Sequence, residues 1–406
     1  MTGLLDDVAR HRLARRLTAA AAQLPDPASP VVLVDLDGVD ANADDLLRRA
    51  AGKPVRLASK SVRVPALIEH ALSREGFAGV LSYQLREALW LVTEGITDDA
   101  VMGYPTVDRI ALEQLLGSGR ALAGITLMVD DPAQLDVVDS VRRGTSAPVR
   151  VAIDVDAGLR MGPSHVGPKR SPLYDARQVV GFAREIVNRP GFTLVGVMTY
   201  EGQVAGVPDV VPDQRVKSLV VRRLKSASVT QLGERRAQID TGLREVADLE
   251  FWNAGGSGSV ESTVADPVVT EVAAGSGLLV PGLFDHYASF QPRPAAFFGL
   301  PVVRRPAADV ATVAGGGFIA SGPTGKDRSP LPWAPPGLRL TGLEGAGEVQ
   351  TPVTGPGAAT LAIGDLVWFR HAKAGELAEH TNTVHLLSGD TVTGSVPTYR
   401  GLGHAW

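Results

Sequence analysis

The feature that most constrains this chain is a regular alternation of short apolar runs with helical segments between residues 31 and 256. Eight short apolar runs, most of them with β-branched residues, have the length of buried strands, at residues 31–36, 55–58, 79–82, 100–103, 125–129, 149–155, 194–200 and 251–254. Helical patterning lies between them, as at residues 42–51, 64–74, 85–93 and 107–116, and the charged stretch 209–248 predicts one long helix or two. Strands that alternate with helices pair in parallel through helical crossovers. Eight units are enough to close a (β/α)8 TIM-type barrel, with an open doubly wound sheet as the alternative.

The sequence changes character after about residue 288. Prolines and glycines become dense, helical periodicity ends, and short β-branched runs such as 309–313 and 366–370 take over. This pattern predicts a second, mainly antiparallel β domain, and 406 residues with 44% hydrophobic content can form two cores. We therefore predict an α/β chain with an N-terminal helix packing on the β domain (residues 1–29), a cofactor-binding barrel (30–287) and a C-terminal β domain (288–406).

Composition and charge exclude several classes of function. A formal charge of −4 provides no basic surface for nucleic acid, and the absence of cysteine excludes disulfides, thiolate metal sites and a cysteine nucleophile. The N-terminus mixes acids with arginines and lacks the apolar segment of a signal peptide, and no stretch approaches the roughly 18 apolar residues of a membrane span. We expect chemistry on a small molecule, without a nucleic-acid or membrane partner, and a cytoplasmic location.

Lys60 follows the second apolar run and is the first candidate catalytic residue. A primary amine at the C-terminal end of a barrel strand faces the region where barrel enzymes do their chemistry. Such a lysine can form a Schiff base with a carbonyl compound or with pyridoxal phosphate. An isolated lysine is usually a solvated surface residue, so this interpretation depends on the other strand ends.

Those strand ends carry a coherent set of residues. Arg160 follows the sixth run and Tyr200 the seventh, where an arginine can act as a fixed cation and a tyrosine can stack on a planar cofactor. Two glycine-rich turns follow, Gly256-Ser257-Gly258 and Gly275-Ser276-Gly277. Glycines let backbone N–H groups approach a phosphate, and barrels commonly bind phosphate after strands seven and eight. An ordinary tight turn is the alternative for either run, and Arg160 and Tyr200 could equally be surface and rim residues.

A cluster of histidines near the C-terminus is the remaining candidate site. His371, Lys373 and His380 could supply general acid and base groups, and His371, His380 and Asn382 are candidate metal ligands. A lysine ammonium is not a usual metal ligand, and an amide oxygen is a weak ligand for zinc. The sequence therefore leaves a divalent metal open.

As an ordered set, these motifs resemble the fold-type III pyridoxal-phosphate enzymes with an alanine racemase-like barrel. The chain is most similar to the D-threonine aldolase and D-serine dehydratase branch, which includes proteins described as amino acid deaminase/aldolase. The resemblance places Lys60 at the Schiff-base lysine, Arg160 beside the cofactor's phenolate oxygen and Tyr200 against the pyridine ring. It places Gly256, Ser257 and Gly258 at the phosphate turn, with Gly275, Ser276 and Gly277 as its second half. It also implies a homodimer in which the partner's β domain completes each site.

The chain departs from the family at two places. The racemases carry an arginine opposite the pyridine nitrogen, where this chain has Ala273 and Ala274, and a catalytic tyrosine from the β domain without a clear match here. The aldolase branch holds a metal through a histidine and, two residues later, a cysteine or aspartate. The nearest equivalent is His371-Ala-Lys373, in which the ammonium could replace the charge of the metal, and His380-Thr-Asn382 is a second candidate.

The resemblance implies a pyridoxal-phosphate-dependent lyase that acts on D-amino acids, with β-hydroxy D-amino acids as the expected substrates. The substrate would be cleaved by retro-aldol reaction or deaminated by dehydration through an aldimine on Lys60, while His371, Lys373 or His380 handles the hydroxyl proton. Three alternatives stay open: an amino acid racemase, a non-catalytic pyridoxal-phosphate-binding protein, and a barrel lyase that forms its Schiff base without the cofactor.

Overall fold

The computed structural model describes residues 5–144, 147–291 and 293–406, and the chain divides into two compact units. The barrel unit contains Asp45–Lys60, Leu67–Gly275 and Trp406. The β unit contains Ser61–Ala66, Ser276–Ala405 and the described residues before Asp45. Two of the points at which the chain passes from one unit to the other follow Lys60 and Gly275, inside segments that the sequence singles out.

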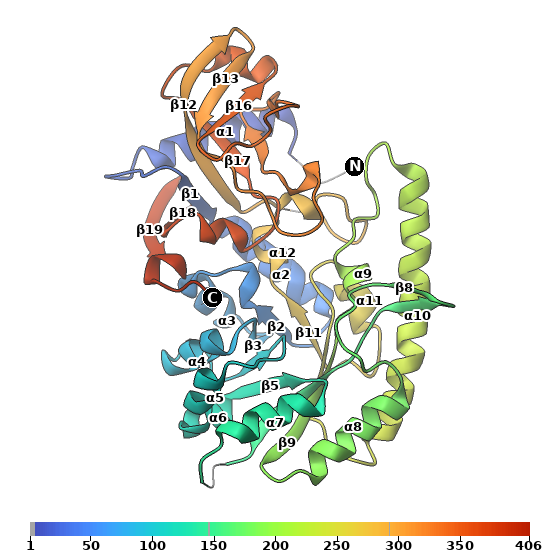
Figure 1. Ribbon diagram of the computed structural model, residues 1–406. Helices are drawn as coiled ribbons and strands as arrows, with labels where there is room; N and C mark the ends of the chain where they lie inside the picture. Colours follow the sequence, from blue (N-terminus) through green and yellow to red (C-terminus); the bar gives the residue numbers. More distant parts are fainter. Residues whose placement is uncertain (1–4, 145–146, 292) are drawn as a thin grey trace. The chain divides into compact units, whose positions relative to one another are not determined.

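Eight parallel strands close the barrel, which confirms the predicted fold class and excludes the open sheet (Figure 1). In barrel order they are β2 (Val55–Ala58), β3 (Phe77–Ser82), β4 (Ala100–Met102), β5 (Ile125–Val129), β6 (Val149–Asp154), β9 (Phe192–Thr199), β10 (Phe251–Ala254) and β11 (Glu271–Ala274). Closure leaves no open edge and gathers all eight C-terminal strand ends at one rim.

The assignment of the first barrel strand from the sequence was wrong, and one barrel strand was missed. The run at 31–36 forms strand β1 (Val31–Asp35), but this strand belongs to the β unit, where it pairs with β12 (Ala296–Ala307) and β18 (Thr383–Ser388). The eighth barrel strand is instead β11, between β10 and β2. This strand contains Glu271, whose buried carboxylate accepts hydrogen bonds of 2.7 and 2.8 Å from Arg56. A charged residue at a buried position hides the strand from a search for apolar runs.

Aspartates begin several of the helices that connect the strands. The side chains of Asp108, Asp131 and Asp175 each accept a backbone N–H of the following turn, and the last two form capping boxes with a glutamine. The charged stretch 209–248 contains one 29-residue helix, α10, which packs on α8. The helices are α1 (Asp7–Ala21), α2 (Leu36–Ala50), α3 (Pro65–Leu72), α4 (Leu85–Thr93), α5 (Arg109–Leu116), α6 (Gly119–Gly124), α7 (Pro132–Val141), α8 (Ala176–Asn188), α9 (Gly202–Ala205), α10 (Arg215–Leu243), α11 (Val260–Val264) and α12 (Ser276–Leu279).

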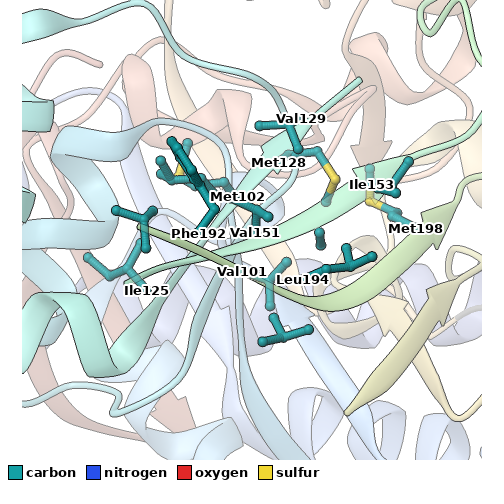
Figure 2. Close-up of a cluster of buried hydrophobic side chains, with 14 of the residues drawn as sticks. Val101, Met102, Ile125, Met128, Val129, Val151, Ile153, Phe192, Leu194 and Met198 are labelled. Atoms are coloured by element: carbon teal, nitrogen blue, oxygen red, sulfur yellow. The ribbon is translucent and has the colours of Figure 1, made fainter. Parts of the chain in front are cut away.

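Aliphatic and sulfur-containing side chains form the core of the barrel unit. Figure 2 shows part of this core, with side chains from neighbouring strands packed against each other. The labelled residues are Val101, Met102, Ile125, Met128, Val129, Val151, Ile153, Phe192, Leu194 and Met198. Because the core is apolar, the polar groups able to do chemistry lie where the strands end.

The β unit contains a nine-stranded sheet that is antiparallel except where β1 pairs with β18, as predicted for a mainly antiparallel domain. Besides β1, β12 and β18, its strands are β13 (Val310–Ala314), β14 (Leu331–Ala334), β15 (Arg339–Leu340), β16 (Gln350–Thr354), β17 (Leu366–Arg370) and β19 (Thr391–Pro397). Helix α1 contacts β14, β17 and β1, and it buries Leu13 and Leu17 in a cluster with Trp368 and Phe297. Residues 1–4, at the start of the predicted N-terminal helical region, lie outside the described residues.

A short hairpin follows strand β6 in the barrel unit. It consists of β7 (Leu159–Met161) and β8 (Ser164–Val166), and β7 contacts the long helix α10. Among the helices that the structure describes, none combines the length and hydropathy needed to cross a bilayer.

Candidate active site

Lys60 lies in a single 3-10 turn, Ser59–Ser61, immediately after strand β2. Its Nζ donates a 3.1 Å hydrogen bond to the phenolic oxygen of Tyr104, which follows strand β4. Both side chains are half-buried. The predicted lysine thus meets a phenol at the C-terminal ends of the barrel strands, in a position suited to proton exchange.

Arg170 adds a cation to this pair. Its guanidinium carbon lies 5.5 Å from the centre of the Tyr104 ring and 5.7 Å from that of Tyr200. Burial alone would raise the pKa of Tyr104, but the charges and hydrogen bonds of Lys60 and Arg170 outweigh it, so the pKa of this phenol is lowered. The two neighbouring cations therefore stabilise the phenolate and raise the fraction of Tyr104 that is ionised at a given pH, and the ionised form is the one that can accept a proton.

Tyr200 follows strand β9, as the sequence predicts, and its ring borders a glycine turn. Burial raises the pKa of Tyr200, so this phenol keeps its proton. A Cβ added to Gly256 would lie 3.4 Å from the Tyr200 ring and 2.9 Å from Cβ of Ala205. The preceding Gly255 has a φ of +82°, which favours glycine. The backbone at Gly256 therefore approaches the Tyr200 ring closely, and a side chain at this position would fill the space between them.

The two predicted glycine turns meet in the structure. The N–H of Gly275 donates a 3.3 Å hydrogen bond to Oγ of Ser257, joining the end of β11 to the turn after β10. Gly258 is buried in the first turn, and Ser276 and Gly277 begin α12 in the β unit. Paired turns of this kind offer backbone N–H groups to an anion such as a phosphate.

The carboxylate of Glu201 anchors the first glycine turn. Its carboxylate accepts the N–H of Gly255 at 3.0 Å and the hydroxyl of Thr263, and it pairs with Arg236 at 3.3 Å. Both charged side chains are almost fully buried. A buried charge that is paired and hydrogen-bonded in this way holds the loop in one conformation.

Arg160 lies on strand β7 and is half-exposed. Its guanidinium carbon stacks 3.5 Å from the Tyr174 ring centre, and its Nη2 lies 3.6 Å from Oδ2 of the buried Asp156. The Asp156 carboxylate also contacts His165 at 2.9 Å and accepts the N–H of Gly158 at 2.8 Å. These contacts differ from those of Arg170, which lies over the Tyr104 and Tyr200 rings.

Two carboxylic acids occupy the ends of adjacent strands in the same unit. Asp154 ends β6, and Asp130 follows the neighbouring β5. Burial, assisted by the charge of Asp130 and opposed by that of Arg170, raises the pKa of Asp154 to about 7. Burial also raises the pKa of Asp130, whose Oδ1 accepts a 2.7 Å hydrogen bond from Gln134. Asp154 therefore changes its charge close to neutral pH.

In the β unit, three predicted residues line one small cavity: His371, Lys373 and His380. Nζ of Lys373 donates a 2.6 Å hydrogen bond to Ser321 and lies 3.5 Å from Glu376. The ring of His380 stacks on Phe318 at 4.3 Å. Burial and the nearby Arg370 lower the pKa of His371 to about 3, so its ring is neutral. Burial also lowers the pKa of His380.

The residues of this cavity do not fit a divalent metal. Asn382, a predicted candidate ligand, is exposed and does not line the cavity. Across the described part of the chain, no group of three or more histidine, aspartate or glutamate side chains is arranged to hold a metal ion. The position two residues after His371 holds an ammonium, which repels a cation.

Tyr104, Arg170, Asp130 and Asp154 did not emerge as site residues from the sequence. Tyr104 and Asp130 follow β4 and β5, two strands whose ends the sequence analysis did not read. Asp154 lies inside the sixth run, whose end drew attention to Arg160 alone. Arg170 lies in the connection between β8 and α8, where no local pattern marks it.

Comparison with known proteins gives a family and a fold. The sequence matches the family described as alanine racemase, N-terminal domain, over residues 34–245. It is 27% identical over 272 residues to a D-threonine aldolase from Arthrobacter sp., a match that spans 66% of this chain and 65% of that protein.

Solved structures agree over nearly the whole chain. The fold is similar to that of D-threonine aldolase from Filomicrobium marinum, with a TM-score of 0.77 and 22% identity over 92% of this chain and 95% of that chain. It is also similar to D-threo-3-hydroxyaspartate dehydratase from Delftia sp. HT23, with a TM-score of 0.71 and 20% identity over 93% and 98%. A cysteine-to-alanine variant of a D-threo-3-hydroxyaspartate dehydratase, described as its metal-free form, has a TM-score of 0.69 and 20% identity over 93% and 98%.

The family match covers more than half of the chain and includes strands β2 to β9 of the closed barrel. The chain therefore belongs to the alanine racemase N-terminal domain family, the barrel of the fold-type III pyridoxal-phosphate enzymes.

Proposed function

We propose that this chain is a pyridoxal-phosphate-dependent lyase that acts on β-hydroxy D-amino acids. The observation that carries the proposal is the Lys60 amine at the end of strand β2, 3.1 Å from the Tyr104 phenol. The D-threonine aldolase and the dehydratase among the similar proteins support this substrate class.

The residues of the barrel unit fit the cofactor. Lys60 offers an amine to the cofactor's aldehyde carbon, the Tyr200 ring offers a surface to a planar ring, and the turn at Gly256 provides space that a Cβ would fill. The turn at Ser257 and Gly275 suits the phosphate. Bound there, pyridoxal phosphate would supply an electron sink for the electron pair released at the substrate's Cα.

The residues around Lys60 would then control the proton on its Nζ. Tyr104 accepts a hydrogen bond from Lys60 Nζ, and its lowered pKa raises the fraction present as phenolate, which can accept a proton from that nitrogen and return it. The positive charge of Arg170 would favour the ionised form of Tyr104, so Arg170 would act on the reaction through Tyr104. Arg160, by resemblance, would approach the phenolate oxygen of the cofactor.

Two outcomes are compatible with such a site, loss of the β-hydroxyl with deamination and cleavage of the Cα–Cβ bond. In either outcome, His371, Lys373 or His380 would exchange a proton with the substrate's hydroxyl group. Racemisation is a weaker candidate, because Ala273 and Ala274 occupy the end of β11, where the racemases carry an arginine. A non-catalytic cofactor-binding role and a cofactor-independent Schiff-base lyase are further alternatives.

The first test is the visible absorbance of the purified protein before and after borohydride. We expect a yellow band that borohydride bleaches, with the reduced cofactor mapped to the peptide that contains Lys60. Lys60→Ala should lack the band, and Lys217→Ala, at an exposed lysine on α10, should keep it. A colourless protein that pyridoxal phosphate cannot restore would contradict the proposal and favour the cofactor-independent lyase.

A second test separates the reactions. Protein loaded with cofactor is incubated with D-threonine, D-serine, D-threo-3-hydroxyaspartate and their L-enantiomers. Glycine with an aldehyde indicates cleavage, a keto acid with ammonia indicates dehydration, and the appearance of the opposite enantiomer without either product indicates a racemase.

We further propose that the enzyme is a homodimer located in the cytoplasm, as the family resemblance implies for the dimer. Light scattering of the loaded protein gives the mass, with 42.6 kDa expected for a single chain. A mass of one chain at all concentrations would contradict the dimer.

A further inference from the structure

We infer that the β unit carries an ammonium-centred cluster, Lys373–Ser321–Glu376, at the first of the two candidate metal motifs, His371-Ala-Lys373, and that this chain works without a divalent metal in this cavity. The metal content is independent of the proposed function. Only the use of the ammonium in the reaction rests on that function.

The first observation is the direction of the hydrogen bonds. Lys373 Nζ donates to Oγ of Ser321 at 2.6 Å, and the same hydroxyl donates its own proton to the carboxylate of Glu376. The backbone N–H of Ser321 donates to the other carboxylate oxygen at 2.9 Å. The three side chains thus form a continuous donor–acceptor chain from ammonium to carboxylate.

The second observation is the charge balance. Nζ of Lys373 lies 3.5 Å from Oε1 of Glu376, and the two opposite charges balance. Burial tends to raise the pKa of Glu376, but the hydrogen bonds from Ser321 and the charge of Lys373 outweigh it and lower the pKa. The carboxylate, the anionic group of this cavity, is therefore ionised and already engaged, and a divalent cation would have to displace the ammonium to reach it.

The third observation concerns the two imidazoles. His371 is buried, and neither ring nitrogen makes a hydrogen bond of ordinary geometry within the described part of the chain. His380 presents its ring face to Phe318 at an angle of 16° between the planes. One buried imidazole beside an ammonium and a stacked ring does not make a coordination sphere, since metal sites need three or four ligand atoms converging on one point.

A lysine in this position can replace part of what a metal does. An ammonium stabilises negative charge that develops on a nearby oxygen, and it can also give up a proton to that oxygen, which a metal ion cannot. Ser321 connects it to Glu376, whose carboxylate balances the charge of the ammonium and fixes its position. The cluster thus takes a hydroxyl or alkoxide oxygen as its ligand, the group that a β-hydroxy amino acid carries.

The metal content of the wild-type protein tests the inference directly. We would purify the full chain without a histidine tag and without chelator, dialyse it, and measure Mn, Zn, Fe, Co, Ni and Mg by mass spectrometry. We expect less than about 0.1 metal ion per chain, and no heat of binding when ZnCl₂ or MnCl₂ is titrated into the loaded protein. About one tightly held ion per chain, removed by EDTA and lost in His371→Ala, would overturn the inference.

A substitution tests whether Lys373 is the residue that prevents metal binding. Lys373→Asp replaces the ammonium with a carboxylate two residues after His371, and we expect this variant to gain binding of Zn²⁺ or Mn²⁺ by at least about 100-fold. Lys326→Asp, at an exposed lysine of the same unit, is the matched control and should gain nothing. A folded Lys373→Asp that binds no more metal than the control would refute the role of Lys373. If Lys373→Asp does not fold, Lys373→Cys is measured in its place and judged by the same comparison.

The role in the reaction needs a separate readout. Lys373→Met keeps the length of the side chain and removes its charge, whereas Lys373→Arg keeps the charge. With an active wild type, we expect Lys373→Met to lose more than about 10-fold in kcat with its visible absorbance unchanged, and Lys373→Arg to recover part of that loss. Equal activity of Lys373→Met and wild type would refute a catalytic ammonium. A wild type that turns over no substrate of the panel contradicts the proposed function while the metal measurement stands.

Discussion

Nζ of Lys60 donates a 3.1 Å hydrogen bond to the phenolic oxygen of Tyr104, joining the end of strand β2 to the end of strand β4. Arg170 lies over the ring of the same tyrosine. The positive charges of the amine and the guanidinium, with their hydrogen bonds to the phenol, outweigh burial and lower the pKa of Tyr104.

Removing the phenol of Tyr104 should affect the reaction and not the fold. We expect Tyr104→Phe to keep the visible band of the bound cofactor and to lose about 10- to 100-fold in kcat, because the proton on Lys60 loses its acceptor. The measurement is steady-state kinetics across pH 6–10 with the wild type alongside, and the melting temperature serves as the control for folding. Unchanged kcat at every pH would exclude Tyr104 from the proton transfer.

Arg170 should control the ionisation of Tyr104. Without its charge the pKa of Tyr104 rises, so a smaller fraction of the phenol is ionised at neutral pH. We expect Arg170→Ala to move the acidic limb of the pH–rate profile to higher pH, and Arg170→Lys to move it less. Arg160→Ala, prepared in parallel, tests the role that the family resemblance gives to that residue; a shift in Arg160→Ala with none in Arg170→Ala would reverse our assignment.

Asp154 makes stability depend on pH in the acid-to-neutral range. Its pKa is about 7 in the folded chain and about 3.8 when solvated, so the folded state binds more protons between these values, and stability falls as the pH rises through this window. Asp154→Asn carries no charge at any pH. We expect the variant to be more stable than the wild type at pH 8 by up to about 4 kcal/mol, with the difference shrinking toward pH 4.5, at about 1.4 kcal/mol per pKa unit.

Urea denaturation at the two pH values measures this difference. Asp98→Asn, at a side chain that is 95% exposed, is the control and should show no such pH dependence. A constant difference between Asp154→Asn and the wild type from pH 4.5 to pH 8 would mean that Asp154 is ionised throughout.

The turn at Gly256 should not tolerate a side chain. Gly256→Ala places a methyl group 2.9 Å from Cβ of Ala205 and 3.4 Å from the Tyr200 ring, so the turn or the ring must shift. We expect cofactor affinity to fall by at least about 10-fold, measured by titration of the visible band. Gly181→Ala on α8, where nothing lies within 4 Å, is the matched control and should instead stabilise the protein by about 0.5–1 kcal/mol. Equal affinities in the two variants would place the cofactor elsewhere.

The sequence by itself determined the class of architecture and several residues of the candidate site. Apolar runs of strand length, helical periodicity and glycine turns are local signals, because the chain has to satisfy its backbone hydrogen bonds and backbone torsion angles segment by segment. They were sufficient to predict a closed barrel with a β domain. They also placed Lys60, Tyr200 and the turns at Gly256 and Gly275 at strand ends.

Only the tertiary structure decided which sheet each strand joins. The residues of β1 are apolar enough for either core, and the edges they pair with, on β12 and β18, lie more than 250 residues further along the chain. Strand β11 could not be found from its residues, because the buried Glu271 depends on hydrogen bonds from Arg56, 215 positions away, and from Asn253 on the neighbouring strand. The contact between Lys60 and Tyr104 likewise joins residues 44 positions apart and could not be found from either segment alone. A local pattern encodes the conformation of a segment, whereas pairing, charge compensation and shared protons depend on which distant segments folding brings together.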